Sequence, residues 1–137
     1  MPAPSAGMSE TWVSARLRTL VAERADHRCE YCGIRETDTF LGCQVDHIIS
    51  EKHGGLTTED NVALACTVCN RAKGSDIAGV DQAGSIAPLF HPRLDRWAEH
   101  FRRDGRQIAG LTAKGRATAR LLRFNAPERL DERGLTE

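Results

Sequence analysis

The sequence predicts a small α+β domain in which a metal-clamped core is flanked by helices. Two Cys-x-x-Cys pairs, Cys29 with Cys32 and Cys66 with Cys69, are separated by 33 residues. The segment between the pairs has two short apolar stretches on either side of a polar, glycine-containing run, which is typical of a β-hairpin. Apolar residues at helical spacing stand before the first pair and after the second.

A chain of 137 residues fits one domain with an appended smaller unit. Its apolar runs fall short of the roughly 20 residues that a membrane-spanning helix needs. The first residues lack the basic and apolar regions of a signal peptide, so we expect residues 1–8 to be a disordered tail and the protein to be cytoplasmic. In that reducing compartment, paired cysteines more often bind a metal than form disulfides.

The formal net charge is zero, but the two parts of the chain differ in sign. Residues 1–90 contain 8 basic and 12 acidic side chains, whereas residues 91–137 contain 11 basic and 7 acidic ones. A polyanionic partner would therefore be held by the second part. A solvated amphipathic tail explains the same composition.

The first expected helix begins at Ser9, whose side chain can cap it, and ends near Arg24. Its apolar residues follow helical spacing at Val13, Leu17, Leu20 and Val21. We expect this face to pack over the core.

Each Cys-x-x-Cys pair directs two thiolates at one ion from a single tight turn, and four thiolates suit tetrahedral Zn²⁺. We therefore expect one structural zinc ion on four residues, Cys29, Cys32, Cys66 and Cys69. A redox-active pair and a reduced, metal-free quartet are the alternatives. Cys43 is the odd cysteine, and we expect a small buried apolar residue there rather than a ligand.

The two pairs can share one ion only if the segment between them returns to its start. A hairpin does this, and we expect its strands at residues 40–49 and 61–65, with Gly54 and Gly55 in the connection. After the second pair the chain should form a short helix that ends at Gly74.

Polar residues that can carry chemistry surround this hairpin. Asp46 offers a hard oxygen ligand, and its neighbour His47 offers an imidazole that can take up a proton near neutral pH. Neighbours on a strand point to opposite faces, so both serve one site only if the strand ends or bends there. Asn70 can supply a second oxygen ligand, and Asn61 can hydrogen-bond across the loop. Taken singly, each would more often be a cap, turn or surface residue.

With these residues the chain resembles the HNH endonuclease family, which has the ββα-metal fold. The resemblance covers residues 29–73 and rests on the Asp46-His47 pair, on Asn61, and on Asn70 directly after a Cys-x-x-Cys pair. It implies that His47 is the general base that activates water and that Asn61 secures the loop. It also implies that Asp46 and Asn70 hold a catalytic divalent metal. Asparagine in place of a final histidine fits Mg²⁺ better than a soft metal.

The resemblance further implies hydrolysis of phosphodiester bonds in nucleic acid, with double-stranded DNA favoured and a 5′-phosphate product. Mg²⁺ or Mn²⁺ would act as a Lewis acid while His47 takes a proton from water. Arg71 and Lys73 follow the motif and can grip adjacent phosphates, and His53 beside the glycine turn can approach one.

The remainder of the chain is expected to form a basic helical extension over residues 78–126. A loop over residues 77–82 is followed by Pro92, which can begin a helix. Apolar residues of that helix recur at i, i+3, i+4 and i+7, namely Leu94, Trp97, Ala98 and Phe101. A short strand is expected over residues 107–111.

Thr112 can cap a last helix that carries Arg116, Arg120 and Arg123 on one stripe. These arginines can grip the phosphates of a nucleic acid without reading its bases, although a plain solvated face is equally compatible with the pattern. We expect residues 127–137 to be frayed.

The sequence thus divides into a disordered tail over residues 1–8, an HNH nuclease domain over 9–77, the extension over 78–126 and a frayed tail over 127–137. A metal-dependent endonuclease is the leading hypothesis. A non-catalytic, zinc-stabilised module that binds nucleic acid is the alternative, and it leaves the arrangement of Asp46, His47 and Asn70 unexplained. A third reading is an interaction protein that dimerises through the helix containing Trp97 and Phe101.

Overall fold

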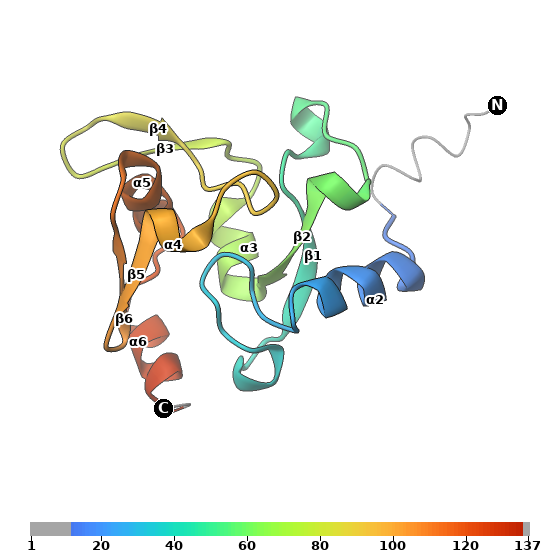
Figure 1. The fold of residues 1–137 in the computed structure, drawn as a ribbon, viewed down its shortest axis with the longest axis horizontal. Coiled ribbons are helices and arrows are strands. Elements are labelled where there is room, and N and C mark those ends of the chain that lie inside the picture. The colour runs from blue at the N-terminus through green and yellow to red at the C-terminus, as the bar shows by residue number, and fades with distance from the viewer. Residues whose placement is uncertain (1–11, 136–137) are drawn as a thin grey trace.

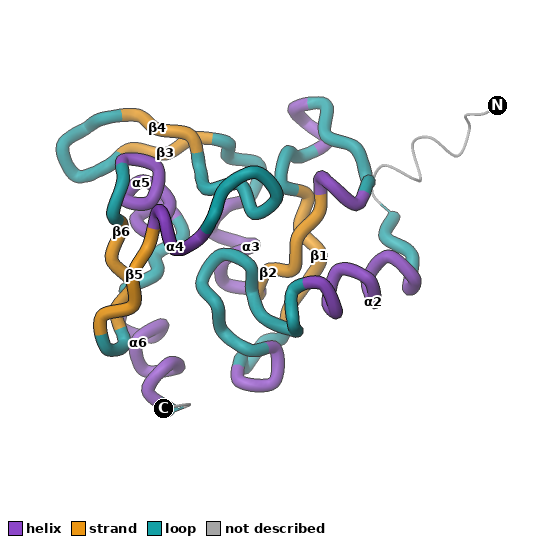
Figure 2. The backbone as a smooth tube through the Cα atoms, viewed as in Figure 1, coloured by secondary structure: helices purple, strands orange, loops and turns teal. Residues whose placement is uncertain are grey.

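The computed structural model describes residues 12–135, so the expected tail over residues 1–8 and the expected cap Ser9 lie outside the described part. The fold is α+β, as predicted, and its strands form three separate antiparallel pairs (Figure 2). The hairpin of β1, Cys43–His47, and β2, Val62–Cys66, lies with helix α2, Ala15–Arg24, on one side (Figure 1). On the other side lie helix α5, Ala113–Leu121, and two further hairpins, β3–β4 at Ala78–Val80 and Ile86–Pro88 and β5–β6 at Phe101–Asp104 and Gln107–Gly110. Within the described residues, no helix is long and apolar enough to cross a membrane.

Helix α2, Ala15–Arg24, is the first element, and Ser14 caps it by accepting a hydrogen bond from the Leu17 N–H at 3.0 Å. The helix begins at Ala15 and not at Ser9 as expected, and it buries Val21 in the core, whereas Leu20, also expected on the packed face, is 36% exposed. Its last residue, Arg24, donates to the carbonyl of Val62 at 2.7 Å and thereby fixes the helix end to the start of β2.

The predicted hairpin is present; its first strand is shorter than expected at both ends, and its second strand is shifted by one residue. Strand β1, Cys43–His47, pairs with β2, Val62–Cys66, so that Cys43 lies opposite Cys66. Gly42 has a φ of +81°, which ends the extended backbone before Cys43 and leaves Phe40 exposed. The connection carries two short 3-10 helices, η2 at Glu51–His53 and η3 at Glu59–Asn61.

Helix α3, Thr67–Lys73, follows β2 without a loop and ends at Gly74, which confirms the predicted short helix. Cys66 is its N-cap, because the sulfur of Cys66 accepts a hydrogen bond from the Cys69 N–H at 3.4 Å. The helix packs on both strands of the hairpin, and the three elements together form a ββα unit.

The extension is not mainly helical, contrary to expectation. The segment expected as a loop over residues 77–82 contains β3, Ala78–Val80, which pairs with β4, Ile86–Pro88. The helix expected from Pro92 is reduced to α4, Trp97–His100, and Phe101 begins a strand instead. Three further elements follow, namely β5 at Phe101–Asp104, β6 at Gln107–Gly110 and α5 at Ala113–Leu121.

The shortened helix has a local cause. The Asp95 carboxylate accepts from the His91 N–H at 2.9 Å and holds a turn where the helix would begin. Gly105, at a φ of +62°, then makes the tight turn that pairs β5 with β6. Leu94, expected on the buried side, is 80% exposed as a result.

Residues 127–134, expected to be frayed, form helix α6, Pro127–Gly134, with proline in its first turn. Three charged residues of this helix are buried, Arg129, Glu132 and Arg133. Each has a partner elsewhere in the fold, and the Glu132 carboxylate accepts from the Phe40 N–H at 3.1 Å. Polar contacts, which a periodicity of apolar residues does not reveal, hold this helix in place.

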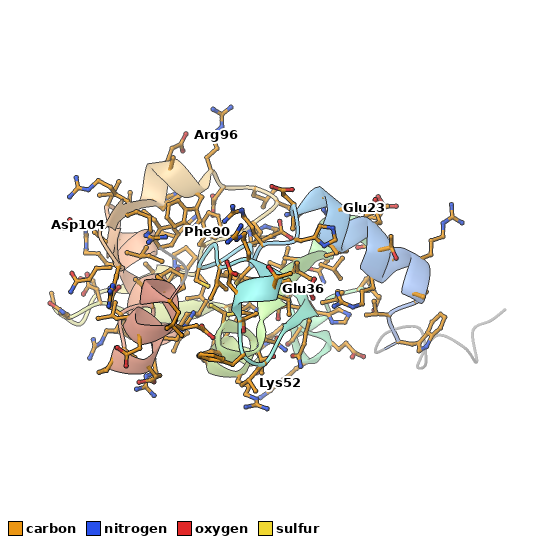
Figure 3. All side chains as sticks on the ribbon, turned by 90° about the horizontal axis from the view of Figure 1, so that it is seen from below. Glu23, Glu36, Lys52, Phe90, Arg96 and Asp104 are labelled. Atoms are coloured by element: carbon orange, nitrogen blue, oxygen red, sulfur yellow. The ribbon has the colours of Figure 1, made fainter. Side chains whose placement is uncertain are left out.

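One apolar core joins the ββα unit to the extension. Phe90 lies in the middle of the molecule, whereas Arg96 projects from its edge (Figure 3). The Phe90 ring forms T-shaped contacts with the rings of Tyr31 and Phe101 at centroid distances of 6.4 and 5.4 Å. Phe101 also packs on Phe124 at 5.5 Å. Tyr31 comes from the first cysteine pair, so the two parts share their core.

Substituting Phe101 with alanine should therefore destabilise the whole chain. Phe101 is 2% exposed, and removing a buried phenylalanine side chain typically costs about 3–5 kcal/mol of unfolding free energy. Phe40, which is 74% exposed, provides the control, and Phe40→Ala should change the unfolding free energy by no more than about 0.5 kcal/mol. Chemical denaturation in the presence of zinc measures both. Separate transitions for the two parts would contradict a shared core.

Candidate metal centre and active site

Four cysteine side chains meet at one buried point. The sulfur atoms of Cys29, Cys32, Cys66 and Cys69 all lie within 4.8 Å of one another. The Cys32 and Cys66 sulfurs are 3.8 Å apart, which matches the edge of a tetrahedron whose centre is about 2.3 Å from each sulfur, the usual Zn–S distance. The residues present therefore fit a tetrahedral metal ion, and the predicted quartet is brought together.

Each pair is shaped by its own backbone. The Cys29 sulfur accepts from the Cys32 N–H at 3.4 Å, and the second pair repeats this contact at the same distance. Gly33, at a φ of +83°, lets the first turn fold back so that the Cys29 N–H donates to the Ile34 carbonyl at 2.8 Å. Antiparallel pairing of β1 with β2 then returns the second turn to the first.

The pKa values of the four thiols are shifted in different directions. Burial raises the pKa of Cys29 and of Cys69, whereas hydrogen bonds from Cys29 lower the pKa of Cys32 and of Cys66. A divalent cation at the centre would favour four thiolates. Cys43 stands apart from the quartet, and burial raises its pKa to about 12. It is a neutral, buried thiol, as expected.

Asp46 is buried and already bonded. Its carboxylate accepts from the Tyr31 hydroxyl at 2.8 Å and lies 3.3 Å from the Lys73 ammonium group. Burial raises the pKa of Asp46, while the nearby Lys73 opposes this rise. Lys73, expected on the surface as a phosphate contact, is only 2% exposed and also donates to the His47 carbonyl at 3.0 Å. Lys73 is therefore not the surface phosphate contact that we expected. Its side chain is turned inward, where it supplies the counter-charge for the buried Asp46 carboxylate.

His47 ends β1 on the other face of the strand. Its Nε2 atom lies 2.8 Å from the Thr57 hydroxyl oxygen, in the connection between the strands. Among the described residues, no hydrogen bond joins the side chains of His47 and Asp46. The structure thus places the imidazole beside the loop and the carboxylate beneath α3.

Asn70 lies on the same side of the hairpin as Asp46. Its amide donates to Gln44 at 2.5 Å, and Gln44 shares a face of β1 with Asp46 because the two are two residues apart. Asn70 and Lys73 likewise share a face of α3. The two oxygen ligands expected for a catalytic metal therefore project into one interface, between β1 and α3.

Asn61 holds the loop, as predicted. Its side-chain oxygen accepts from the Ile49 N–H at 3.0 Å, and its amide donates to the carbonyls of Ile49 and Leu56 at 2.9 and 2.8 Å. A side chain at Gly55 would collide with the Ile49 carbonyl and with this amide, so the glycine permits the close approach. His53 is exposed on the same loop.

The expected phosphate-binding residues divide into two groups. Arg71 is exposed on α3, near the ββα unit. Arg116, Arg120 and Arg123 line a hollow of about 710 Å³ between α5 and β6. Arg120 donates there to the Asp81 carbonyl at 2.7 Å, and Arg123 lies 3.6 Å from the Glu128 carboxylate.

Several residues that shape the site were missed from the sequence. Tyr31 sits between the ligands of the first cysteine pair, and its position inside a Cys-x-x-Cys turn is the one local signal for it. Thr57 and Arg129 give no comparable signal. The Arg129 guanidinium donates to the Cys69 sulfur at 3.2 Å across 60 residues of sequence.

Comparison with protein-family models finds a match to the family described as HNH endonuclease over residues 29–76. Searches among curated proteins and among solved structures find no match. The matched segment begins at the first metal-site cysteine and contains the hairpin, its loop and α3. The HNH family comprises nucleases, which act on nucleic acids. The segment of residues 29–76 thus matches the HNH endonuclease family and contains, inside a ββα unit, four cysteines placed to form a metal site.

Proposed function

We propose that this protein is a metal-dependent endonuclease that hydrolyses phosphodiester bonds in nucleic acid, with double-stranded DNA as the favoured substrate. The observation that carries the proposal is the placement of His47, at the end of β1, within the segment that matches the HNH family. The Thr57 hydroxyl, on the loop held by Asn61, contacts this imidazole and supports its orientation. An imidazole so oriented suits a general base, because a base must be held within reach of its water.

His47 is proposed to take the proton of the attacking water. One ring nitrogen contacts Thr57, which orients the ring and leaves the other nitrogen for a second partner. Asn61 contributes indirectly, by tying Ile49 and Leu56 so that the loop carrying Thr57 keeps its shape. Neither role needs Asp46 and His47 to touch.

Asp46 and Asn70 are proposed to hold a divalent ion such as Mg²⁺ or Mn²⁺. Their carboxylate and amide oxygens are the donors that a hard cation prefers, which supports the assignment. When bound, the ion would act as a Lewis acid toward the phosphate. Lys73 lies 3.3 Å from the Asp46 carboxylate, so the ion and this ammonium group would compete for, or share, the same oxygens.

Contacts with the nucleic-acid backbone are proposed at two places. Arg71 and His53 are exposed on α3 and on the loop, where they can meet phosphates beside the scissile bond. Arg116, Arg120 and Arg123 line a separate hollow on the extension and would bind phosphates farther along the strand. Such contacts position a nucleic acid without reading its sequence.

A non-catalytic, zinc-stabilised module that binds nucleic acid is the second candidate. The bonds that Tyr31 and Lys73 already make to Asp46 favour it, because they satisfy the carboxylate without a divalent ion. The two candidates differ in a measurable way, since only the enzyme cleaves.

Substituting His47 with alanine should strongly reduce the rate of cleavage while leaving the fold intact. General-base catalysis typically contributes about 10²–10⁴-fold to a rate, so nicking of supercoiled plasmid with Mg²⁺ or Mn²⁺ should fall by that factor. His27 is exposed and distant in sequence, and His27→Ala should retain full activity. Cleavage by His47→Ala at the wild-type rate would remove this residue from the mechanism. Zinc-loaded, folded wild-type protein that cleaves neither duplex, single-stranded DNA nor RNA would favour the second candidate.

Removing the metal from the cysteine quartet should unfold the protein. Structural zinc sites of this kind contribute roughly 10–16 kcal/mol of apparent binding free energy, and this core is small. Circular dichroism during titration with a zinc chelator should show loss of structure. Cys69→Ala should be unfolded at any zinc concentration, whereas Cys43→Ala, outside the quartet, should bind zinc and fold. A fully folded, metal-free wild-type protein would contradict a structural role.

Removing two arginines from the hollow should weaken binding to duplex DNA and reduce its salt dependence. Each lost phosphate contact lowers the slope of log K against log salt by about 0.9, so Arg116→Gln with Arg123→Gln should reduce it by roughly 2. Arg96→Gln with Arg102→Gln removes the same charge from exposed sites outside the hollow and is the control. Fluorescence anisotropy of the zinc-loaded variants without added Mg²⁺ or Mn²⁺, so that cleavage is prevented and the cysteine quartet keeps its metal, measures both. Equal slopes for the two double variants would exclude the hollow as a phosphate site.

A further inference from the structure

We propose that Arg129 is the outer-shell cation of the four-cysteine metal centre, so that helix α6 forms part of the metal site and sets its affinity. This inference concerns the metal centre alone and does not depend on the proposed nuclease activity.

The Arg129 guanidinium reaches the sulfur atoms directly. Its Nη2 atom donates to the Cys69 sulfur at 3.2 Å and to the Cys66 sulfur at 3.8 Å, while Nη1 donates to the Leu122 carbonyl at 2.8 Å. Arg129 is 3% exposed, and an arginine side chain keeps its positive charge in proteins. The molecule therefore holds a buried positive charge against the second cysteine pair.

Charge balance gives this contact a role. One divalent ion with four thiolates has a net charge of −2, and a buried net charge is costly unless a partner compensates it. A guanidinium that donates to two of the sulfurs removes part of that charge and fixes the orientation of the ligands. Groups that hydrogen-bond to metal ligands typically change metal affinity by about 10–100-fold.

The other buried residues of α6 anchor the helix in the position from which Arg129 reaches the cysteine sulfurs. Glu132 and Arg133 lie three and four residues farther along, on the same face of the helix. Glu132 accepts from the Phe40 N–H at 3.1 Å, and Arg133 donates to the Phe124 carbonyl at 2.5 Å. The buried face of α6 is thus charged and anchored at three points, and Arg129 is the residue of this face that contacts the metal ligands.

The first cysteine pair has an arginine of a different kind nearby. Arg93 forms an ion pair with Glu30, which lies between Cys29 and Cys32, and Glu30 in turn accepts from the Leu64 N–H at 2.8 Å. Arg93 therefore supports the turn through a carboxylate, whereas Arg129 contacts sulfur. This difference makes Arg93 the matched control for the proposal.

The test uses the full-length chain with four forms, wild type, Arg129→Met, Arg129→Lys and Arg93→Met. Zinc affinity is measured by competition with a chromophoric chelator. The electron-donating strength of the thiolates is followed by the wavelength of the sulfur-to-metal absorption bands of the Co²⁺-substituted protein. Arg129→Met should lower zinc affinity about 10–100-fold. It should also move the Co²⁺ bands to longer wavelength, because thiolates that lose a hydrogen bond donate electrons more readily.

The variants separate an electronic role from general loosening of the fold. Arg129→Lys keeps the charge but offers a single donor group, so its band shift should be smaller than that of Arg129→Met. Arg93→Met should leave the Co²⁺ bands in place. Wild-type affinity and bands in Arg129→Met, or equal shifts in Arg129→Met and Arg93→Met, would overturn the proposal. If Arg129→Met does not fold, Arg129→Lys decides, and unchanged bands and affinity in that variant would overturn it as well.

Discussion

The convergence of four buried sulfur atoms is the constraint on which the rest of the molecule depends. Two Cys-x-x-Cys turns 33 residues apart are useful to one ion only when the intervening hairpin returns its ends to the same place. The strand register, with Cys43 opposite Cys66, follows from that requirement. Because a metal ion holds ligands far more tightly than apolar contacts hold side chains, a small core can rely on it for its shape.

Tyr31 connects the sulfur site to the proposed active site. Tyr31 lies between the first two cysteines, and its hydroxyl donates to the Asp46 carboxylate at 2.8 Å. Its backbone carbonyl accepts from the Trp97 side chain at 2.8 Å, so the extension also contacts the turn of the first cysteine pair. A change in the position of the first pair would therefore reach Asp46 directly. The sulfur cluster and the interface between β1 and α3 are therefore joined by a direct hydrogen bond.

The extension has a structural role as well as a charge. Arg93 and Trp97 contact the first cysteine pair, and Arg129 contacts the second. Residues far along the chain thus enclose both halves of the metal centre and bury it. The basic face on α5 points into a different hollow, which leaves it available for a partner.

The sequence by itself determined the order of the ligands, the hairpin between them, the caps of α5 and α3, and the loop contact of Asn61, because these features depend on neighbouring residues and fixed spacing. The partners of Lys73 and Arg129 were decided only by the tertiary structure. Lys73 turns inward to Asp46 across 27 residues and Arg129 to Cys69 across 60. A buried charge takes whichever opposite charge the fold brings near it, and no local pattern of apolar residues encodes that choice.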